Sequence, residues 1–491
     1  MISFILSCIA LTLGYFIYGK FAERVFNIDP DRPTPANSEY DGVDYVPLPL
    51  WKSFLIQFLN IAGTGPIFGA VAGAMWGPWA FIWIVFGNIF AGAVHDIMVG
   101  MMSVRSKGAS ISELVGENLG QTAKWVMVIF SIILLLLVGV VFVSSPADLL
   151  ANLTHINRWW WIGIILFYYI IATILPIDVI IAKIYPVFGV ALVIMAIGIV
   201  VGMISNGDFA QIPEFSFHNP HVEGVSVFPY VCISIACGAI SGFHATQSPL
   251  IARTIQNEKE GRQVFYGAMI AEGFVALIWA AATMTFFGGL EGLAAQGGKA
   301  AVIVNEISSG LMGKVGMILA ILGVVALPIS SGDTAFRSIR LTIADTFKIP
   351  QKDAKARYLI SLPLFAVAIG LLFIDFNIIW RYFSWSNQTL AMIALWAAAA
   401  YLKKHDRNYW VTVIPAMFMT VVVTSYITIA PEGFGAVWGE NTVLAEQVGL
   451  GLGIALMSLC TFLFLRTDFK SEAEDTILIE ESPLVKEEVL S

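Results

Sequence analysis

Apolar residues form long runs along most of the chain, and short polar segments separate them. A helix needs about 20 apolar residues to cross a hydrocarbon core of roughly 30 Å. The runs that approach this length lie at about residues 2–19, 53–77, 79–103, 122–145, 159–176, 184–204, 228–250, 262–287, 314–346, 357–374, 379–402, 409–430 and 443–465. The pattern therefore predicts an all-α polytopic membrane protein with thirteen spans.

The composition agrees with the hydrophobic pattern. The 491 residues are 58% hydrophobic and only 13% charged, and the mean hydropathy is +0.80. Soluble domains carry roughly 25% charged residues. The net charge of −8 says less, because the segment 466–491 contributes much of the acid. That segment is polar and charged, and we expect a solvated cytoplasmic tail.

The loops between the predicted spans differ in their cations. Loops 205–227 and 431–442 contain neither Lys nor Arg. The loops that contain clusters of them are 20–52, 104–121, 251–261, 346–357 and 403–408. Because Lys and Arg accumulate on the cytoplasmic side, this alternation predicts an N-terminus outside the cell and a cytoplasmic C-terminus.

Two predicted spans contain residues that interrupt helices. The second carries Gly63-Thr64-Gly65-Pro66 in its middle. The seventh carries Gly238, Ser241, Gly242, His244, Thr246, Gln247, Ser248 and Pro249. In lipid, each orphaned backbone group costs several kcal/mol unless it faces protein or a water-filled cavity. These two spans are therefore predicted to be broken helices in the protein interior; the alternative is a pair of ordinary kinked helices.

The two predicted breaks divide the chain into related blocks. Each interrupted span opens a block of five spans, at 53–204 and 228–402, and an odd number of spans gives the blocks opposite orientations. The remaining segments are an extra helix (1–20), a cytoplasmic linker (21–52) and two C-terminal helices (409–465). Interrupted helices at matching positions of inverted halves are typical of secondary transporters with a binding site at the membrane midplane.

The third predicted span contains an acidic residue. Asn88, Gly92, Asp96 and Gly100 recur every four residues and form one stripe of a helix. Glycines beside a carboxylate indicate a closely packed neighbouring helix, so Asp96 is a candidate for a coupling ion or, alternatively, a structural cap. His95 lies on an adjacent face, and we expect it to be a packing residue that does not pair with Asp96.

The ninth predicted span carries a second polar stripe. Ser330, Asp333, Thr334 and Arg337 follow one another at i, i+3, i+4 and i+7. Their hydroxyl and carboxylate oxygens suit a hard cation such as Na⁺, so Ser330, Asp333 and Thr334 are further candidates for the coupling ion. The alternative is an i,i+4 ion pair between Asp333 and Arg337.

Candidate substrate groups lie at the second break and in the eleventh span. His244 sits in the break, with Ser241 and Gln247 one turn to either side, and could bind an anion or titrate. It could equally satisfy freed carbonyl groups. Asn387 and Gln388 are predicted either to form a wall of the cavity or to make helix–helix hydrogen bonds. The role of Glu272, in the eighth span, stays open.

Several motifs are absent from the sequence. It contains no GxxxxGK[ST] phosphate loop, no HExxH, no GxSxG and no CxxC pair. We therefore expect neither an ATP-driven transporter nor an enzyme, and no cofactor beyond a coupling cation, either H⁺ or Na⁺. The expected partners are a small-molecule substrate and the lipid bilayer, with no nucleic acid.

The motifs resemble those of the carbon starvation protein A (CstA) family. They occur in the order of the family across residues 30–395, and they read DPDRPTPANSEYDGVDYVP, IAGTGPI, AGAVHD, SVRSKGASISELVGENLG, ISGFH, ISSGDTAFRSIR and SNQTLA. The resemblance implies a bacterial inner-membrane transporter with a LeuT-like five-plus-five inverted repeat, linked to uptake of peptides and, in some members, of pyruvate with protons. The matching positions are Gly63, Gly65, Pro66, Asp96, Ser241, Gly242, His244, Asp333, Thr334, Asn387 and Gln388.

One segment departs from the family pattern. Ile56-Gln57-Phe58 stands before the first break, where family members often carry His-His-Phe. Taken together, these patterns predict a secondary active importer of peptides or amino acids, coupled to a cation. The half-helix after Gly65 and the hydroxyls of Thr64 and Ser241 would bind a substrate carboxylate. The alternatives are a pyruvate/proton symporter, a nutrient receptor that does not transport, and an intramembrane enzyme.

Overall fold

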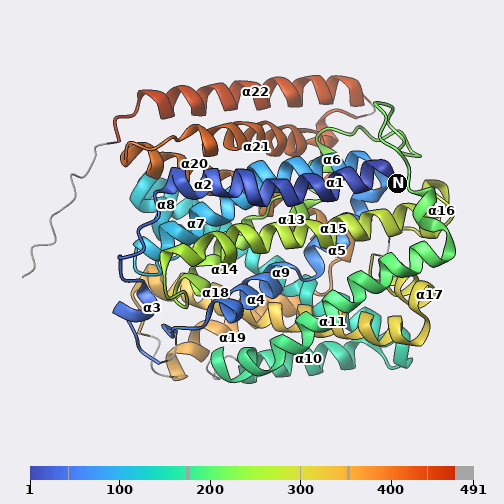
Figure 1. The fold of residues 1–491 in the computed structure, drawn as a ribbon, viewed down its shortest axis with the longest axis horizontal. Coiled ribbons are helices and arrows are strands. Elements are labelled where there is room, and N and C mark those ends of the chain that lie inside the picture. Colours follow the sequence, from blue (N-terminus) through green and yellow to red (C-terminus); the bar gives the residue numbers. More distant parts are fainter. Residues whose placement is uncertain (43, 173–176, 299, 351–353, 440, 470–491) are drawn as a thin grey trace, which may run out of the picture.

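The computed structural model describes residues 1–42, 44–172, 177–298, 300–350, 354–439 and 441–469, and in that part of the chain every regular element is a helix (Figure 1). The first half contains α1 (Ile2–Leu13), η1 (Gly14–Tyr18), α2 (Gly19–Phe26), α3 (Pro35–Ser38), α4 (Leu50–Ile61), α5 (Thr64–Gly73), η2 (Ala74–Trp76), α6 (Trp79–Gly87), η3 (Asn88–Gly92), α7 (Ala93–Arg105), α8 (Ile111–Leu119), α9 (Gln121–Thr154), α10 (Arg158–Ala172), α11 (Ile177–Asn206) and η4 (Asp208–Gln211).

The second half continues in the same way. Its elements are α12 (Tyr230–Ser234), α13 (Ala236–Ala239), α14 (Gly242–Ala252), η5 (Glu258–Glu260), η6 (Arg262–Tyr266), α15 (Gly267–Phe286), α16 (Leu290–Ala294), α17 (Ala300–Ala320), η7 (Ile321–Ala326), α18 (Leu327–Phe347), α19 (Ala354–Leu371), α20 (Phe376–Lys404), α21 (Trp410–Ile429), η8 (Gly435–Val437) and α22 (Thr442–Arg466). Each predicted span therefore coincides with one or more helices.

Not every predicted span is a long, continuous apolar helix. Within the described residues, eight helices are long and apolar enough to cross a membrane, and the bent pair α4–α5 raises the number to nine. The other predicted spans include the 15-residue α10 and the interrupted α12–α14. Gly313, with a left-handed φ of 59°, interrupts α17 one residue before the predicted start of the ninth span.

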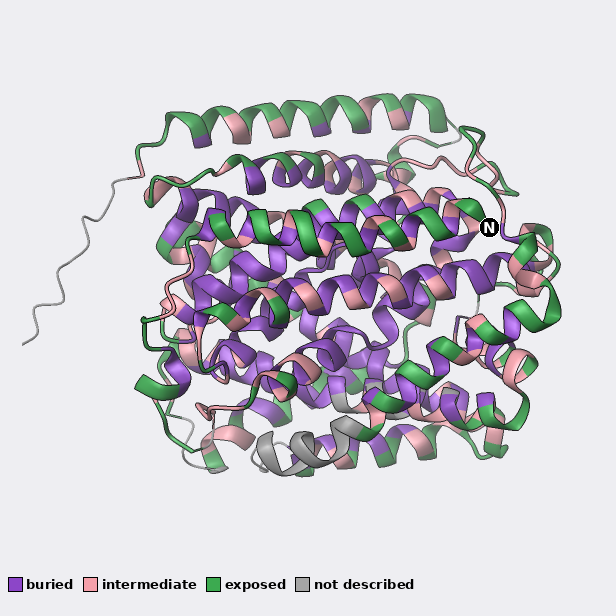
Figure 2. Cartoon of the chain, viewed as in Figure 1, coloured by how far each residue is buried: buried purple, intermediate pink, exposed green. Residues whose placement is uncertain are grey.

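The helices differ strongly in burial. Figure 2 shows α22 at the edge of the molecule almost wholly exposed, whereas the central helices are largely buried. In α22 the buried residues are Ala445, Gly449, Gly453 and Phe464. Exposed apolar side chains such as Leu452 and Phe462 cover the rest of this helix. An exposed surface of this kind suits lipid and not water, because it would otherwise be a large apolar patch in solvent.

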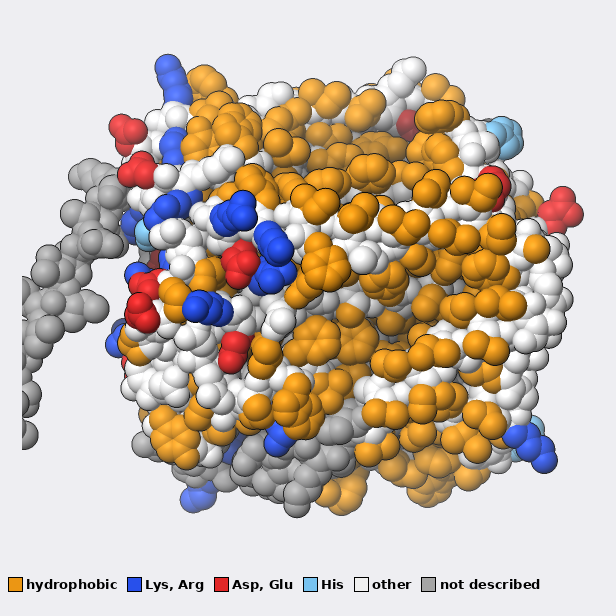
Figure 3. All heavy atoms as spheres, in the orientation of Figure 1, with side chains coloured by type: hydrophobic (Ala, Val, Ile, Leu, Met, Phe, Trp, Pro, Cys, Tyr) orange, Lys and Arg blue, Asp and Glu red, His pale blue; other side chains and the backbone are white. Residues whose placement is uncertain are grey.

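Charge and hydrophobic surface are separated on the visible face of the molecule. Figure 3 shows hydrophobic side chains over most of this face, and Lys and Arg gathered mainly near the end that contains α3 and α8. The apolar helices and this separation of surfaces define a multi-pass membrane protein.

Candidate functional site

The first predicted break lies where the sequence placed it. Helix α4 ends at Ile61, and α5 begins at Thr64 at an angle of 45° to it. Gly63 has φ −70° and ψ −141°, which is not helical, and no side chain caps the N-terminus of α5. Pro66, in the first turn of α5, occupies a position where a missing N–H costs little.

The second break is also confirmed. Helix α13 ends at Ala239, α14 begins at Gly242, and the two residues between them have extended backbones. Ile240 has φ −159° and ψ 143°, and Ser241 has φ −146° and ψ 125°. A further interruption at Ile235 separates α12 from α13. The seventh span is therefore broken twice.

The two broken helices contact each other directly. A Cβ atom on Gly65, in the first turn of α5, would lie 2.5 Å from Sγ of Cys237 in α13. Only glycine fits at this contact without a shift of its neighbours. Sγ of Cys237 in turn lies 3.6 Å from Oγ of Ser241. The two breaks therefore form one buried region in which the start of α5 faces the segment before α14.

Side-chain amides bind the freed backbone of the second break. The Gln388 amide donates to the carbonyls of Ala236 (2.9 Å) and Ile240 (3.2 Å). Oδ1 of Asn387 accepts from N–H of Phe243 (2.7 Å) and from Oγ of Ser241 (3.1 Å).

A third amide comes from another helix. Nδ2 of Asn88, in η3, donates to the carbonyls of Gly238 (3.1 Å) and Met269 (2.8 Å). We call Asn88, Asn387 and Gln388 the amide brace. Of the two roles expected for Asn387 and Gln388, these contacts support hydrogen bonding between helices. The hydroxyl of Ser241 is used within the same network.

The first break has fewer such contacts among the described residues: Oγ of Ser331 donates to the Leu59 carbonyl (3.5 Å), two residues before the end of α4. Gln57 and Thr64 are fully buried. Among the described residues, neither amide atom of Gln57 nor Oγ1 of Thr64 has a hydrogen-bond partner. Buried polar groups without partners are rare and cost about 1–3 kcal/mol each, which marks this region as a place where a ligand or water could bind.

Four fully buried titratable side chains lie beside the second break. Nδ1 of His95 lies 2.8 Å from Oδ1 of Asp96, and Nδ1 of His244 lies 3.0 Å from Oδ2 of Asp96. Nε2 of His244 is 3.4 Å from Oε2 of Glu272. We call His95, Asp96, His244 and Glu272 the His–acid chain. It joins α7, α14 and α15.

The expectation that His95 does not pair with Asp96 was wrong. Neighbouring residues of a helix point about 100° apart, but the imidazole and carboxylate are long enough to meet at 2.8 Å beside the same backbone turn. The close approach predicted for the Asp96 stripe is confirmed. A Cβ on Gly92 would overlap the Ala239 carbonyl, and one on Gly100 would lie 2.6 Å from the Phe265 ring.

Glu272 is the site residue that sequence reasoning did not assign. Its signal was a carboxylate in the apolar run GAMIAEGFV, followed by a glycine. A Cβ on Gly273 would lie 2.6 Å from Nδ2 of Asn88, so a second helix packs against α15 at this point. Nothing in the local sequence links Glu272 to His244, 28 positions earlier, because only the fold brings α14 and α15 together.

The polar stripe of α18 forms a different cluster. Oδ2 of Asp333 lies 3.9 Å from Nη2 of Arg337, and the same nitrogen donates to the Ala172 carbonyl of α10 (3.3 Å). Oγ1 of Thr334 donates to the Ser331 carbonyl of its own helix (2.8 Å). The geometry thus matches the alternative of an internal ion pair. The side chain of Ser330 lies outside the described residues.

The remaining candidates lie on α14. Nε2 of Gln247 donates to Oγ1 of Thr246 (3.0 Å) and to Oγ of Ser338 (3.2 Å), so Gln247 connects α14 to α18. A Cβ on Gly242 would lie 2.7 Å from Cβ of Leu390, which explains the close packing of α14 on α20.

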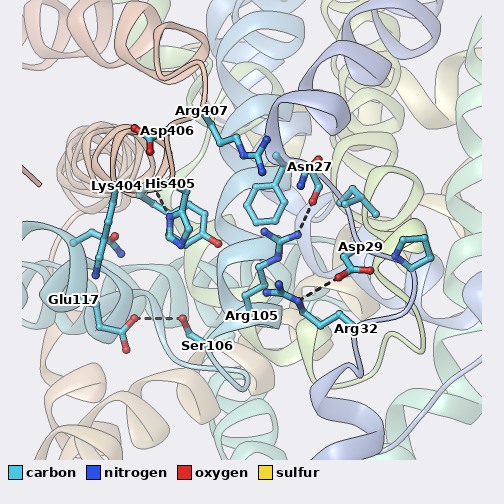
Figure 4. A pocket seen from close by; sticks show the side chains of 15 residues that line it. Asn27, Asp29, Arg32, Arg105, Ser106, Glu117, Lys404, His405, Asp406 and Arg407 are labelled. Atoms are coloured by element: carbon cyan, nitrogen blue, oxygen red, sulfur yellow. Dashed lines mark hydrogen bonds and ion pairs between the residues drawn. The ribbon is translucent and has the colours of Figure 1, made fainter. Parts of the chain in front are cut away.

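A polar cavity of about 660 Å³ lies at the charged end of the molecule and not at the breaks. Figure 4 shows Arg105 and Arg407 pointing toward Asn27 in this cavity, and Glu117 beside Ser106. The residues that line it are Phe26, Asn27, Ile28, Asp29, Pro30, Arg32, Arg105, Ser106, Glu117, Asn118, Tyr401, Lys404, His405, Asp406 and Arg407. Arg105 is already paired with buried Glu258, so it is not free to bind a ligand.

Solved structures share this fold. A manganese transporter of Eremococcus coleocola superposes with a TM-score of 0.54 at 14% identity, over 87% of this chain and 98% of its own. The inward-facing conformation of Mhp1 gives 0.51 at 15% identity, over 86% and 93%. The two broken helices and these neighbours define the class: the protein has the LeuT-like five-plus-five transporter fold.

The chain belongs to the carbon starvation protein CstA family, whose sequence profile matches residues 1–155, 145–287 and 280–426. It is 43% identical to an uncharacterised membrane protein of Haemophilus influenzae over 339 residues (58% of this chain, 91% of the relative). It is 28% identical to the pyruvate/proton symporter BtsT of Escherichia coli (54% and 46%) and 30% identical to the peptide transporter CstA of Campylobacter jejuni (54% and 47%). The match spans about half the length of these two named transporters.

Proposed function

We propose that this protein is a secondary active transporter that imports a small nutrient bearing a carboxylate, driven by a coupling cation. The observation that carries the proposal is the contrast between the breaks. At the second, the amide brace binds backbone carbonyl and N–H groups, while at the first the buried side chains of Gln57 and Thr64 have no hydrogen-bond partner among the described residues. A transporter of this fold binds its substrate at such interrupted helices.

The start of α5 is the proposed carboxylate site. Its first N–H groups have no intrahelical acceptor, and the helix dipole places partial positive charge there. Oγ1 of Thr64 adds a hydroxyl donor beside these amides. Peptides or amino acids are the leading substrates because several relatives are named peptide transporters. Pyruvate is the second candidate, because one relative is named a pyruvate/proton symporter.

Asp96 is the proposed coupling residue. It is fully buried and is held by two imidazoles, one of them on the half-helix α14 that follows the second break. A change in the charge of Asp96 therefore acts on the position of α14. The coupling cation would be H⁺ or Na⁺, and no other cofactor is needed.

The proposed location is the inner membrane of a bacterial cell. The Lys and Arg clusters gather at one end of the molecule (Figure 3), and cations accumulate on the cytoplasmic side of membrane proteins. We therefore assign the end with α3 and α8 to the cytoplasm. The N-terminus then lies outside, and the end of α22 and the tail after it lie inside.

Transport into proteoliposomes tests the proposal. Labelled dipeptides, amino acids and pyruvate are offered under an imposed pH or Na⁺ gradient, with protein-free vesicles as the control. We expect uphill accumulation of at least one of these substrates, abolished when the gradient is collapsed. Accumulation of none of them would contradict the transport function.

The substitution Asp96→Asn tests the coupling role in the same assay. It keeps the size of the side chain and removes its charge, so we expect loss of uphill accumulation with exchange of substrate across the membrane still measurable. Normal accumulation by this variant would show that Asp96 is structural.

A further inference from the structure

Glu272 is a carboxyl group that the fold leaves almost without partners. It is fully buried in α15, and neither of its oxygens accepts a hydrogen bond from the described residues. The group nearest to pairing with it is Nε2 of His244, at 3.4 Å. By contrast, both oxygens of Asp96 lie within 3.0 Å of an imidazole nitrogen.

A buried carboxylate without partners cannot stay ionised at a small cost, since removal of a charge from water costs several kcal/mol or more. Two protonation states remove this cost. Either Glu272 is a carboxylic acid that donates to Nε2 of neutral His244, or His244 is an imidazolium that pairs with ionised Glu272. In both states the Glu272–His244 pair holds the same extra proton.

We infer that Glu272 is a proton site of the transport cycle, and that His244 passes the proton between Glu272 and Asp96. In the first step the O–H bond of Glu272 breaks and an N–H bond forms at Nε2 of His244. In the second step the N–H bond at Nδ1 breaks and an O–H bond forms on Oδ2 of Asp96. One proton moves along the His–acid chain, and no other reactant is needed.

The position of His244 links this transfer to movement. His244 lies in the first turn of α14, directly after the extended residues of the second break, whereas Glu272 lies on the continuous helix α15. Movement of α14 at the break changes the 3.4 Å separation between His244 and Glu272. Proton transfer is therefore possible in one conformation and interrupted in another, which is what coupling to alternating access requires.

The surroundings of Glu272 favour a proton over Na⁺. Among the described residues the titratable group beside it is His244, followed by Asp96 and then His95 along the chain. A hard cation prefers several oxygen ligands, but both oxygens of Asp96 face imidazole nitrogens. The inference rests on the proposed function, because it assigns the proton to the cycle in which substrate is transported.

The substitution Glu272→Gln tests the inference with two measurements. The first is a pH titration of the purified protein in membranes, followed by infrared difference spectroscopy. We expect a pH-dependent carboxyl band of Glu272 in the wild type, from the acid or from the carboxylate, that is missing from Glu272→Gln. The matched control Glu291→Gln changes an exposed carboxylate of α16 and should keep the band. A band unchanged in Glu272→Gln would overturn the inference.

The second measurement compares exchange with accumulation in proteoliposomes. We expect Glu272→Gln to exchange substrate close to the wild-type rate but to lose accumulation driven by a pH gradient by about 10²-fold, the scale of a lost proton-transfer group. Wild-type accumulation by Glu272→Gln would also overturn the inference.

The experiments also distinguish two other outcomes: failure of the wild type to transport, and failure of the Glu272→Gln variant to fold. If the wild type transports none of the substrates, the proposed function fails while the infrared titration still tests Glu272. If Glu272→Gln does not fold, Glu272→Asp replaces it. The aspartate keeps the carboxyl but lengthens the separation from His244, so we expect a shifted band and reduced accumulation. An unshifted band with full accumulation would count against the inference.

Discussion

The two breaks interrupt the backbone in similar ways, but the polar side chains around them differ. At the second break, amide side chains from η3 and α20 bind the carbonyls of Ala236, Gly238 and Ile240 and the N–H of Phe243. At the first, no side chain caps α5, and Gln57 and Thr64 have no partners among the described residues.

In the proposed function, this difference makes the second break structural and the first break the substrate site. A group that is already satisfied by protein gains little from a ligand, whereas a buried group without a partner gains the full benefit of a new hydrogen bond. The backbone of the second break is thus largely held by protein groups, and in the proposed function the first break supplies polar groups to the substrate. Three predictions test this division.

The largest effect is expected at the amide brace. In Gln388→Leu the carbonyls of Ala236 and Ile240 lose their donor, and two orphaned buried groups should cost about 2–6 kcal/mol of stability. Thermal unfolding in detergent measures the loss. The matched control is Thr389→Val. Among the described residues the hydroxyl of Thr389 bonds only the Trp385 carbonyl of its own helix, so its loss should change stability little. An unchanged unfolding temperature for Gln388→Leu would contradict the brace.

An intermediate effect is expected where the breaks touch. Gly65→Ala places a methyl group 2.5 Å from Sγ of Cys237, and such overpacking typically costs about 1–3 kcal/mol. We expect transport to fall together with stability. Addition of Cys237→Gly should restore part of both, as a non-additive double-mutant cycle. Gly370→Ala, on a helix with open space around it, should be neutral. Additive losses in the cycle would show that the contact does not matter.

The smallest effect on stability is expected at the first break. Thr64→Val removes a hydroxyl that bonds nothing in the described structure, so the unfolding temperature should stay near that of the wild type. The apparent KM for substrate should rise about ten-fold, the value of one lost hydrogen bond of roughly 1.4 kcal/mol. Ser131→Ala removes a comparable buried hydroxyl from α9 and should change neither quantity. An unchanged KM for Thr64→Val would remove Thr64 from the substrate site.

Sequence patterns located the breaks because their signals are local. The clustering of glycine and proline in GTGP, and of glycine with polar residues in ISGFH, weakens the helix at those points through local sequence alone. The Asp333–Arg337 pair was also foreseeable, since i,i+4 residues of a helix are neighbours.

Contacts between helices could not be predicted in the same way. The pairing of His244 with Glu272 depends on the packing of α14 beside α15, and the brace depends on which side of α20 faces the second break. The contact of His95 with Asp96 depends on side-chain rotamers, which helical spacing alone does not determine. The breaks and the span count indicated inverted five-span blocks, and the family resemblance added the LeuT-like fold. The chain departs from the family at Ile56-Gln57, and Gln57 is a buried residue without a hydrogen-bond partner among the described residues beside the first break.

Helix α20 runs without a break from the second break of the buried site to the polar cavity at the charged end. Its 29 residues include neither Gly nor Pro; Asn387 and Gln388 lie near its middle, and Lys404 at its end lines the polar cavity of Figure 4. At 1.5 Å per residue, the brace and that cavity are about 25 Å apart along one axis. If α20 shifts along its own axis, Asn387 and Gln388 of the brace and Lys404 at the cavity wall move by the same distance. A shift of α20 along its axis at the buried break would therefore also be seen at the wall of the cavity at the charged end.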